Sequence, residues 1–280
     1  MRMTDYDPLY IKYAIVWNPP IGMFDRFPNL KCVASVGAGV SHILKDPNYP
    51  TQIPIIRCAS DALRMRMAEY ILLHVLRFHK RLPEVELAHA KKKWCQFISP
   101  IANEITIGMM GIGNLGAYAA QKLQCMGYKV VGWSRREKNL EKVHSYFGNE
   151  QLHDFLSKVN ILICTLPQTE KTKNILSKET LSKLPKGSSL INVGRGNCLI
   201  EKDLIDLLNA GHLNGATLDV FNKEPLPISH PFWSHEKILV TCHSAGIIDP
   251  AIGGETIANN VKKFINREPG SDFVDIEQGY

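Results

Sequence analysis

With 280 residues, of which 45% are hydrophobic and 21% charged, the chain is long enough for one large or two modest domains, and its composition excludes global disorder. Its net charge of +6 suits an anionic small molecule, or reflects simply a basic surface. The lysine cluster at residues 91–93 is expected to be a solvated face rather than a nucleic-acid patch, because no nucleic-acid-binding motif accompanies it. No apolar run is long enough to cross a bilayer and no signal peptide is evident, so no membrane partner is expected. Seven cysteines without a C-x-x-C pair indicate reduced thiols and a cytoplasmic location.

The first part of the chain is predicted to form a small α/β unit. Its candidate strands are YAIVW at residues 13–17, LKCVASVGAG at 30–39 and IPIIRC at 53–58. The strongly apolar segment at residues 67–82 is predicted to be a helix that bridges to a second domain. The tail at residues 252–264 returns to a helical pattern and is expected to pack back on the first unit.

The second part alternates apolar runs with helix-like stretches between residues 105 and 244. Alternating strands and helices with continuously apolar strands indicate a parallel sheet that is covered on both faces. The predicted strands are ITIGMM at 105–110, KVVGWS at 129–134, NILICTLP at 160–167, SLINVGRG at 189–196, GATLDVF at 215–221 and ILVTCH at 238–243.

A glycine-rich turn follows the first of these strands and opens a helix. Gly111, Gly113 and Gly116 have the spacing G-x-G-x-x-G, which permits a tight turn, close approach of a pyrophosphate and close helix–strand packing. The N-terminal N–H groups of the helix, around Asn114 and Leu115, can then bind phosphates. The turn therefore predicts a dinucleotide site, with a ligand-free glycine turn as the alternative.

The end of the second strand bears on the choice of coenzyme. An acidic residue there would bind the ribose 2′-hydroxyl of NAD, whereas this chain has Ser134, Arg135 and Arg136. Because arginine and serine can bind a 2′-phosphate, we predict a preference for NADP, with NAD still possible. The alternative is that the arginines are merely solvated.

Polar residues follow the later strands and are expected at the same sheet edge as the glycine turn. Arg195 can hold a substrate carboxylate, His243 can give a proton to a carbonyl oxygen, and Glu224 can orient the imidazole. Asp219 is expected to contact the cofactor amide, or alternatively to order a loop. Arg195 could instead cap a helix, Glu224 could be a turn residue, and His243 could be structural. Together they predict hydride transfer from a nicotinamide to a carbonyl carbon with the proton from His243. No metal site is expected, because His230 and His235 lack a third ligand.

These residues together resemble the D-isomer-specific 2-hydroxyacid dehydrogenase family. The match runs through GAGV at residues 37–40, AEY at 68–70, the glycine fingerprint, LPQTEKT at 166–172, NVGRG, LDVFNKEPLP and HSAG. VWNPP at residues 16–20, WSR at 133–135 and the terminal GY resemble the glyoxylate/hydroxypyruvate reductase branch.

The resemblance implies roles for individual residues. Arg195, Glu224 and His243 would be catalytic, and the substrate would contact Arg195 and the backbone of Ala38 and Gly39. Trp17 would line the pocket, unless it is a core residue. Further cofactor contacts are implied for Leu166, Pro167, Thr169, Thr172, Val193 and Gly194. A homodimer formed through the nucleotide domain, near residues 67–82, is also implied.

Three features depart from the family pattern. Only MRMTDYDPLYIK precedes YAIVW, so either the true start lies upstream or the small domain is shortened, which would leave an edge of that strand unpaired. Cys242 stands where the family usually has proline, and Asp249 stands where the close branch has arginine. A carboxylate at residue 249 would repel an anionic substrate, which leaves the preferred 2-oxo acid open.

The fold predicted is α/β, with a doubly wound parallel-sheet Rossmann domain at residues 67–245. A smaller flavodoxin-like substrate domain, N-terminally shortened, would combine residues 1–66 with 246–280. The predicted function is NADPH-dependent reduction of a small 2-oxo acid, such as glyoxylate or hydroxypyruvate, to the 2-hydroxy acid. The alternative is a catalytically weak or inactive NAD(P)-sensing binding protein on the same scaffold, as in the related C-terminal-binding corepressors.

Overall fold

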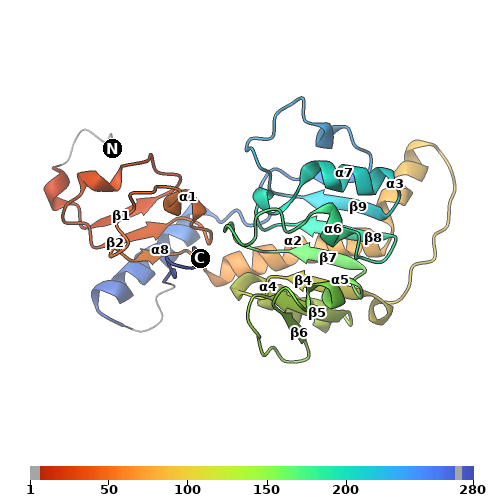
Figure 1. Cartoon of the computed structure of the whole chain (residues 1–280), viewed down its shortest axis with the longest axis horizontal. Helices are drawn as coiled ribbons and strands as arrows, with labels where there is room; N and C mark the ends of the chain where they lie inside the picture. The colour runs from red at the N-terminus through yellow and green to blue at the C-terminus, as the bar shows by residue number, and fades with distance from the viewer. Residues whose placement is uncertain (1–6, 269–272) are drawn as a thin grey trace. The chain divides into compact units, whose positions relative to one another are not determined.

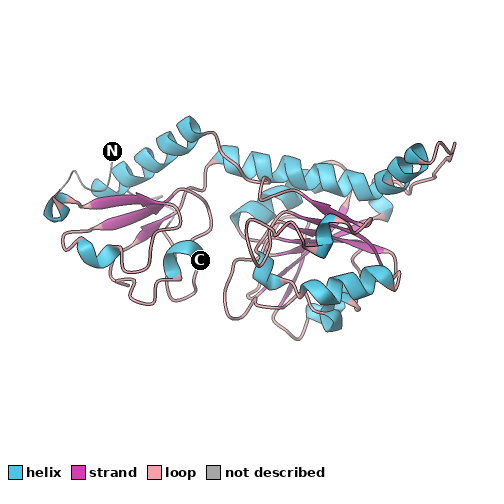
Figure 2. Cartoon of the chain, turned by 90° about the horizontal axis from the view of Figure 1, so that it is seen from above, coloured by secondary structure: helices cyan, strands magenta, loops and turns pink. Residues whose placement is uncertain are grey.

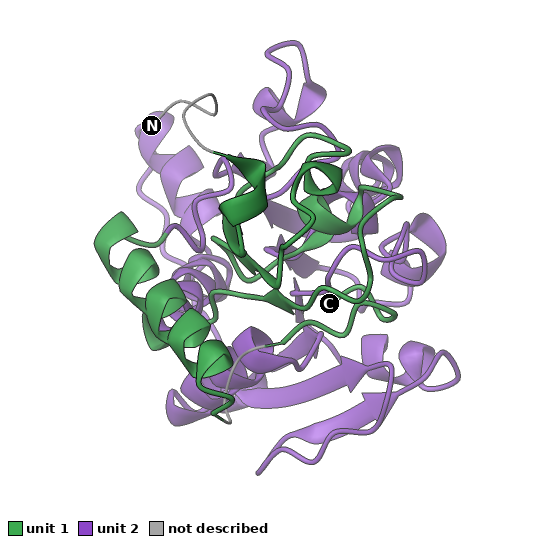
Figure 3. Ribbon diagram, turned by 90° about the vertical axis from the view of Figure 1, so that its left-hand side faces the viewer, with its two compact units in different colours: residues 1–62, 248–280 green, residues 63–247 purple. Residues whose placement is uncertain are grey.

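A computed structural model describes residues 7–268 and 273–280, and it divides the chain into two compact units (Figure 3). Unit 1 combines Met1–Ala62 with Ile248–Tyr280, and unit 2 is Leu63–Ile247. The divisions predicted from the sequence, after residue 66 and before residue 246, lie close to these boundaries. None of the helices in the described ranges is both long and apolar enough to span a bilayer.

Unit 1 is built on a small parallel sheet of order β1-β2-β3, formed by β1 (Tyr13–Val16), β2 (Cys32–Ser35) and β3 (Ile55–Ile56). Its α-helices include α1 (Ser41–Leu44) and α8 (Pro250–Ile265). The apolar face of α8 places Ile257 in a buried cluster with Ala34 and Cys58, so the C-terminal helix packs on this unit as expected. β1 lies at an edge of the described sheet, and its Ile15 is 61% exposed.

Unit 2 contains a parallel sheet of order β10-β9-β8-β7-β4-β5-β6 (Figure 1). The chain builds outward from β4 to β6, then returns to place β7 on the other side of β4. The order therefore reverses between β4 and β7, and such a switch point is where open α/β sheets bind ligands. The strands are β4 (Thr106–Met110), β5 (Lys129–Ser134), β6 (His144–Phe147), β7 (Ile161–Cys164), β8 (Ser188–Asn192), β9 (Leu213–Leu218) and β10 (Ile238–Val240).

Helices cover both faces of this sheet (Figure 2). Ile161 and Ile163 pack into one core cluster, with side chains from α2 (Asp61–His79) and α4 (Asn114–Cys125). Leu162 and Cys164 alternate with them and pack into the cluster on the opposite face. Side chains of the same strand thus enter two cores, because successive residues of a strand point to opposite faces. The α/β class with a doubly wound parallel sheet is confirmed.

The opposite face is covered by α5 (Leu152–Leu156), α6 (Lys178–Leu181) and α7 (Glu201–Asn209), and α3 (Leu82–Ala90) follows α2. Short 3-10 helices lie at Pro8–Tyr10, Phe24–Arg26, Ala102–Glu104, Gly196–Cys198 and Pro231–Trp233.

Two elements differ from the expectation. The sequence pattern did not predict β6, because the strand HSYF buries only Tyr146 and carries no apolar run. The bridging helix α2 begins at Asp61 rather than residue 67, since its first turns mix the exposed Arg66 with the buried Leu63 and show no continuous apolar run.

The contact between α4 and the glycine turn is very close. A Cβ atom at Gly116 would lie 2.0 Å from the backbone oxygen of Gly111. In contrast, a Cβ atom at Gly254, an exposed position of α8, would meet nothing within 4 Å.

The same substitution is therefore expected to have opposite effects in the two helices. Gly116→Ala should destabilise unit 2 by about 1–3 kcal/mol, because the clash is with backbone that cannot yield without moving the turn. Gly254→Ala should stabilise α8 by roughly 0.5–1 kcal/mol, because alanine loses less backbone entropy on folding. Urea unfolding followed by circular dichroism measures both, and equal effects would contradict the packing described here.

Candidate active site

The glycine turn lies directly after β4. Gly111 has a φ of 103°, and its N–H donates to the backbone oxygen of Trp133 at 2.8 Å. Gly113 is the N-cap of α4, no side chain caps that helix, and a Cβ atom at Gly113 would meet nothing within 4 Å. The N–H groups of Asn114 and Leu115 thus begin a helix that faces open space, which fits a phosphate group. Gly116 provides the close packing already described.

The loop after β7 supports this turn. The hydroxyl of Thr165 donates to the Gly111 oxygen at 2.6 Å, a contact that the sequence analysis did not identify. Within the loop, the Thr172 hydroxyl donates to the Pro167 oxygen at 2.6 Å, and the Thr169 N–H donates to the Thr172 hydroxyl at 2.9 Å. Gly194 lies against this loop, because a Cβ there would be 2.6 Å from the Leu166 oxygen. The predicted cofactor residues of this loop are therefore held next to the glycine turn.

The turn after β5 carries Ser134, Arg135 and Arg136. The Ser134 hydroxyl donates to the Arg136 backbone oxygen at 2.6 Å, which folds the chain back at the end of the strand. Arg135 is half-buried and Arg136 is exposed. Because β5 pairs with β4, Arg135 and Arg136 lie on the turn next to the glycine turn. Their part in binding a 2′-phosphate stays a prediction.

Arg195 lies in a tight loop after β8, which ends at Asn192. The fully buried Asn192 amide accepts from the Gly194 N–H and donates to the Arg195 backbone oxygen, both at 3.2 Å. Val193, also predicted to contact the cofactor, is buried in this loop. The Arg195 guanidinium donates from Nη1 to the Gly194 oxygen at 2.7 Å. Asn192 thus shapes the loop, although it looked like an ordinary strand residue in the sequence.

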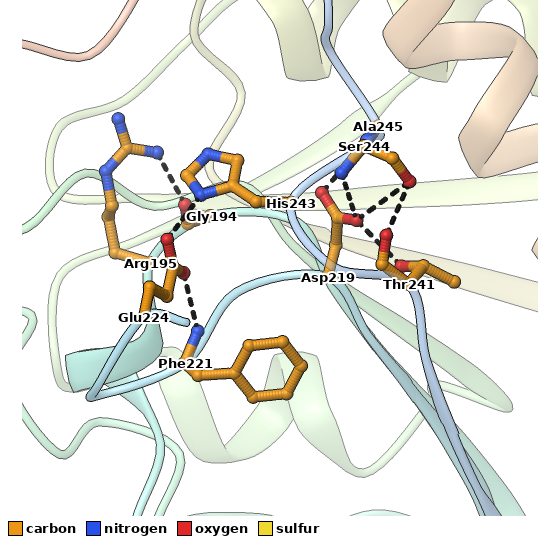
Figure 4. A network of polar contacts seen from close by, with 9 residues as sticks. All are labelled: Gly194, Arg195, Asp219, Phe221, Glu224, Thr241, His243, Ser244 and Ala245. Atoms are coloured by element: carbon orange, nitrogen blue, oxygen red, sulfur yellow. Dashed lines mark hydrogen bonds and ion pairs between the residues drawn. The ribbon is translucent and has the colours of Figure 1, made fainter. Parts of the chain in front are cut away.

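The side chains of Arg195, Glu224 and His243 gather at one place (Figure 4). The His243 Nδ1 lies 2.7 Å from Glu224 Oε2, and Glu224 Oε1 accepts from the Phe221 N–H at 2.9 Å. The side chains of His243 and Glu224 remain 40% and 36% exposed, so a ligand can reach them. The bond from Nδ1 to the carboxylate sets the ring orientation and leaves Nε2 as the nitrogen that can transfer a proton.

Burial and neighbouring charges have opposite effects on the pKa values of Glu224 and Arg195. Burial acts to raise the pKa of Glu224, but the hydrogen bonds from His243 and the Phe221 N–H and the charges of His243 and Arg195 hold it below its usual value. Burial lowers the pKa of Arg195, while the Glu224 charge raises it. A guanidinium stays protonated over the working range of proteins, so the site combines a cation and an ionised carboxylate around the imidazole.

Asp219 orders the segment Thr241–Ala245, which carries His243. Its side chain is 1% exposed and accepts from the Thr241 hydroxyl at 2.7 Å, the Ser244 N–H at 2.8 Å and the Ala245 N–H at 3.0 Å. Its backbone oxygen also accepts from the His243 N–H at 2.7 Å. These contacts support the loop-ordering role that the sequence left open, and a contact with the cofactor amide stays a prediction.

The segment is held in an uncommon backbone conformation. Cys242 and His243 have φ values of 55° and 56°, in the left-handed region. Each such residue costs roughly 1–2 kcal/mol, so the bonds to Asp219 must outweigh that cost. A proline cannot adopt the φ of Cys242, because its ring restricts φ to negative values. The cysteine at this position therefore accompanies a loop conformation that proline excludes.

The remaining predicted site residues belong to unit 1. Trp17 is 57% exposed, so it is not a core residue, and its ring lies 4.5 Å from that of His42. Ala38 and Gly39 are half-buried in the loop after β2, where the Ser35 hydroxyl donates to the Gly39 oxygen at 3.1 Å. Asp249 is the N-cap of α8, accepting from the Ala251 N–H at 2.8 Å. Binding of substrate by Trp17, Ala38 and Gly39 stays a prediction, as does repulsion of an anionic substrate by Asp249.

Comparisons with known proteins identify relatives over almost the whole chain. Residues 72–245 match the family model of the D-isomer specific 2-hydroxyacid dehydrogenase, NAD binding domain. The glyoxylate/hydroxypyruvate reductase A of Photorhabdus laumondii is 38% identical over 98% of this chain and 89% of its own length.

Two solved structures are similar as well. A D-isomer specific 2-hydroxyacid dehydrogenase from Xanthobacter autotrophicus, in complex with NADPH and MES, superposes with a TM-score of 0.94 and 39% identity, over 99% of this chain and 87% of that one. An NADPH-dependent glyoxylate/hydroxypyruvate reductase from Sinorhizobium meliloti, in complex with NADP and sulfate, gives 0.93 and 34%, over 99% and 89%. The chain therefore belongs to the D-isomer specific 2-hydroxyacid dehydrogenase family, in the branch of these glyoxylate/hydroxypyruvate reductases, as its motifs predicted.

Proposed function

We propose that this protein reduces a small 2-oxo acid, of the glyoxylate or hydroxypyruvate type, to the 2-hydroxy acid with NADPH. The observation that carries the proposal is the group formed by Arg195, Glu224 and His243 at the same sheet edge as an uncapped glycine turn. The relatives from Photorhabdus and Sinorhizobium are named for this reaction, and two similar structures hold NADPH or NADP.

The residues present fit a dinucleotide. Gly111, Gly113 and the first N–H groups of α4 would hold the pyrophosphate, and Arg135 and Arg136 would hold the 2′-phosphate. Bound nicotinamide supplies the hydride. The chain's own residues must then hold the substrate, orient it and deliver a proton.

His243 is suited to deliver that proton. With Nδ1 held by the Glu224 carboxylate, the ring is oriented so that Nε2 is the nitrogen that can transfer a proton. Glu224 remains ionised because its pKa is held below the usual value, so it acts as the orienting anion rather than the acid. The proton therefore passes from His243 Nε2 to the carbonyl oxygen of the substrate.

Arg195 supplies the positive charge for an anionic substrate. A guanidinium binds a carboxylate and the adjacent carbonyl oxygen through parallel N–H groups, which fixes the carbonyl carbon for attack. One donor, Nη1, is already used by the Gly194 oxygen and holds the side chain in place, and the remaining N–H groups serve the substrate. The backbone N–H groups of Ala38 and Gly39 are proposed as a second carboxylate contact.

The proposal extends to assembly and location. A homodimer formed through unit 2 is supported by apolar side chains that α2, α3 and the following segment expose: Leu73, Leu82, Val85, Leu87, Trp94, Ile98 and Ile101. A cytoplasmic location is supported by the seven cysteines, which all lie in the described residues and form no disulfide there.

Substitutions in the catalytic group test the mechanism. His243→Gln should lower kcat by roughly 10²–10⁴, because the proton donor is lost, and Arg195→Ala should lower kcat/KM by a similar factor. Steady-state NADPH oxidation with glyoxylate and hydroxypyruvate measures both. His230→Gln is the matched control, since His230 also contacts a carboxylate, Glu201 at 3.3 Å, and should retain activity. Unchanged turnover in the His243 and Arg195 variants would contradict the mechanism.

Substitutions in the turn after β5 test the preference for NADPH over NADH. Wild-type protein should have a higher kcat/KM with NADPH than with NADH. Replacing Arg135 and Arg136 together by alanine should lower kcat/KM for NADPH by about 10–100-fold, the value of one or two charge-assisted bonds. The kcat/KM for NADH serves as the internal control and should stay nearly constant. A preference of the wild type for NADH would overturn the assignment.

Substitutions in the exposed apolar segment after α3 test the proposed dimer interface. Trp94 and Ile98 are each 94% exposed in the isolated chain, and replacing both by glutamate should yield a monomer in sedimentation equilibrium. Ile228→Glu, at a side chain 96% exposed elsewhere in unit 2, should leave the dimer intact. A wild-type monomer, or an equal effect of the two changes, would refute this interface.

A further inference from the structure

A path of hydrogen bonds, from Tyr70 through Thr241 to Asp219, connects helix α2 to the segment that carries His243. The Tyr70 hydroxyl lies 2.6 Å from the Thr241 hydroxyl, which donates to Asp219 Oδ1 at 2.7 Å. That carboxylate in turn accepts from the Ser244 and Ala245 N–H groups, next to His243 (Figure 4). Tyr70 and Thr241 are absent from the catalytic group, yet both are connected to it through one buried carboxylate.

The direction of each bond follows from the protons available. An ionised carboxylate can only accept, so the single proton of the Thr241 hydroxyl is given to Asp219. The Thr241 oxygen must then accept from Tyr70, which is the donor at the start of the path. Burial raises the pKa of Tyr70, the bond to Thr241 offsets this only in part, and the Asp219 charge raises it further, so the phenol keeps its proton.

The ring of Tyr70 is itself held in place. It lies against the ring of His74, with 4.3 Å between ring centroids, in the core cluster that α2 forms on the sheet. Burial, with the nearby Arg77, lowers the pKa of His74 to about 4, so this neighbour is neutral at physiological pH. The donor at the start of the path is therefore packed against the buried core of unit 2.

The path ends on the strained part of the site. Cys242 and His243 both lie in the left-handed region, and the bonds to Asp219 are what hold them there. If the carboxylate loses its bond from Thr241, it can rotate away from the Ser244 and Ala245 N–H groups. His243 would then keep its side-chain contact with Glu224 and the bond from its N–H to the Asp219 backbone oxygen, but the two residues that follow it would lose their bonds to the carboxylate.

We propose that Tyr70 and Thr241 are positioning residues for His243, acting through Asp219. The inference rests on the proposed reductase function. Because Arg195 follows a different strand, β8, loss of the path should alter proton delivery without altering the hold on the substrate carboxylate. The expected signature is a lower kcat with an unchanged KM for the 2-oxo acid.

Substitutions that remove or keep single hydroxyl groups test the path. Tyr70→Phe and Thr241→Val should each lower kcat by about 10-fold, since a small misplacement of a catalytic group has effects of this order or larger. Thr241→Ser keeps the hydroxyl and should restore most of the activity. Tyr128→Phe is the matched control, because it removes another buried phenol bond, to His79 Nδ1 at 2.6 Å, away from the His243 segment. It should leave kcat near the wild-type value.

Amide hydrogen exchange gives a readout that does not depend on turnover. The Ser244 and Ala245 amides should exchange faster in Tyr70→Phe and Thr241→Val than in the wild type or in Tyr128→Phe. Wild-type kcat together with wild-type exchange in Tyr70→Phe would overturn the inference, as would a loss of kcat in Tyr128→Phe equal to that in Tyr70→Phe. A wild-type protein that reduces no 2-oxo acid would instead contradict the proposed function, and the exchange rates would still decide whether Tyr70 holds the segment.

Discussion

The buried carboxylate of Asp219 is the contact on which the candidate active site depends. Two consecutive residues with side chains, Cys242 and His243, adopt backbone angles that are normally left to glycine. Only a group that satisfies several N–H donors at once can hold such a segment, and one carboxylate with four acceptor positions does so. Two carboxylates thus position His243 in different ways: Asp219 holds the N–H groups of the two residues that follow it, and Glu224 holds the imidazole ring.

The parallel sheet explains why these groups meet. Asp219, Arg195, Thr165 and Gly111 each come within three residues of the end of neighbouring strands, β9, β8, β7 and β4, and all of these strands run in the same direction. Parallel strands end at the same edge, so residues far apart in the sequence become neighbours there. The N-terminus of α4 and the Arg195 guanidinium both place positive charge at that edge.

Burial and neighbouring groups both shift the pKa values of Glu224 and Tyr70, with different results. Burial alone would raise the pKa of Glu224, but two hydrogen bonds and two neighbouring cationic groups prevail, and the side chain keeps its charge. At Tyr70, burial prevails and the phenol remains a donor. Glu224 therefore stays a hydrogen-bond acceptor and Tyr70 stays a donor, because the two side chains have different partners.

The sequence by itself determined the α/β class, the glycine turn and the order of Arg195, Glu224 and His243, because these depend on local patterns: strand runs, glycine spacing and the residue that follows each strand. It did not reveal β6, whose HSYF pattern buries one side chain, nor the supporting contacts of Thr165, Asn192, Tyr70 and Thr241. It also left open whether Asp219 orders a loop. The tertiary structure decided these points, because a hydroxyl or amide in a strand or helix has no local signal that names its partner. Such partners, up to 171 residues apart for Tyr70 and Thr241, are chosen only when the sheet and its helices pack.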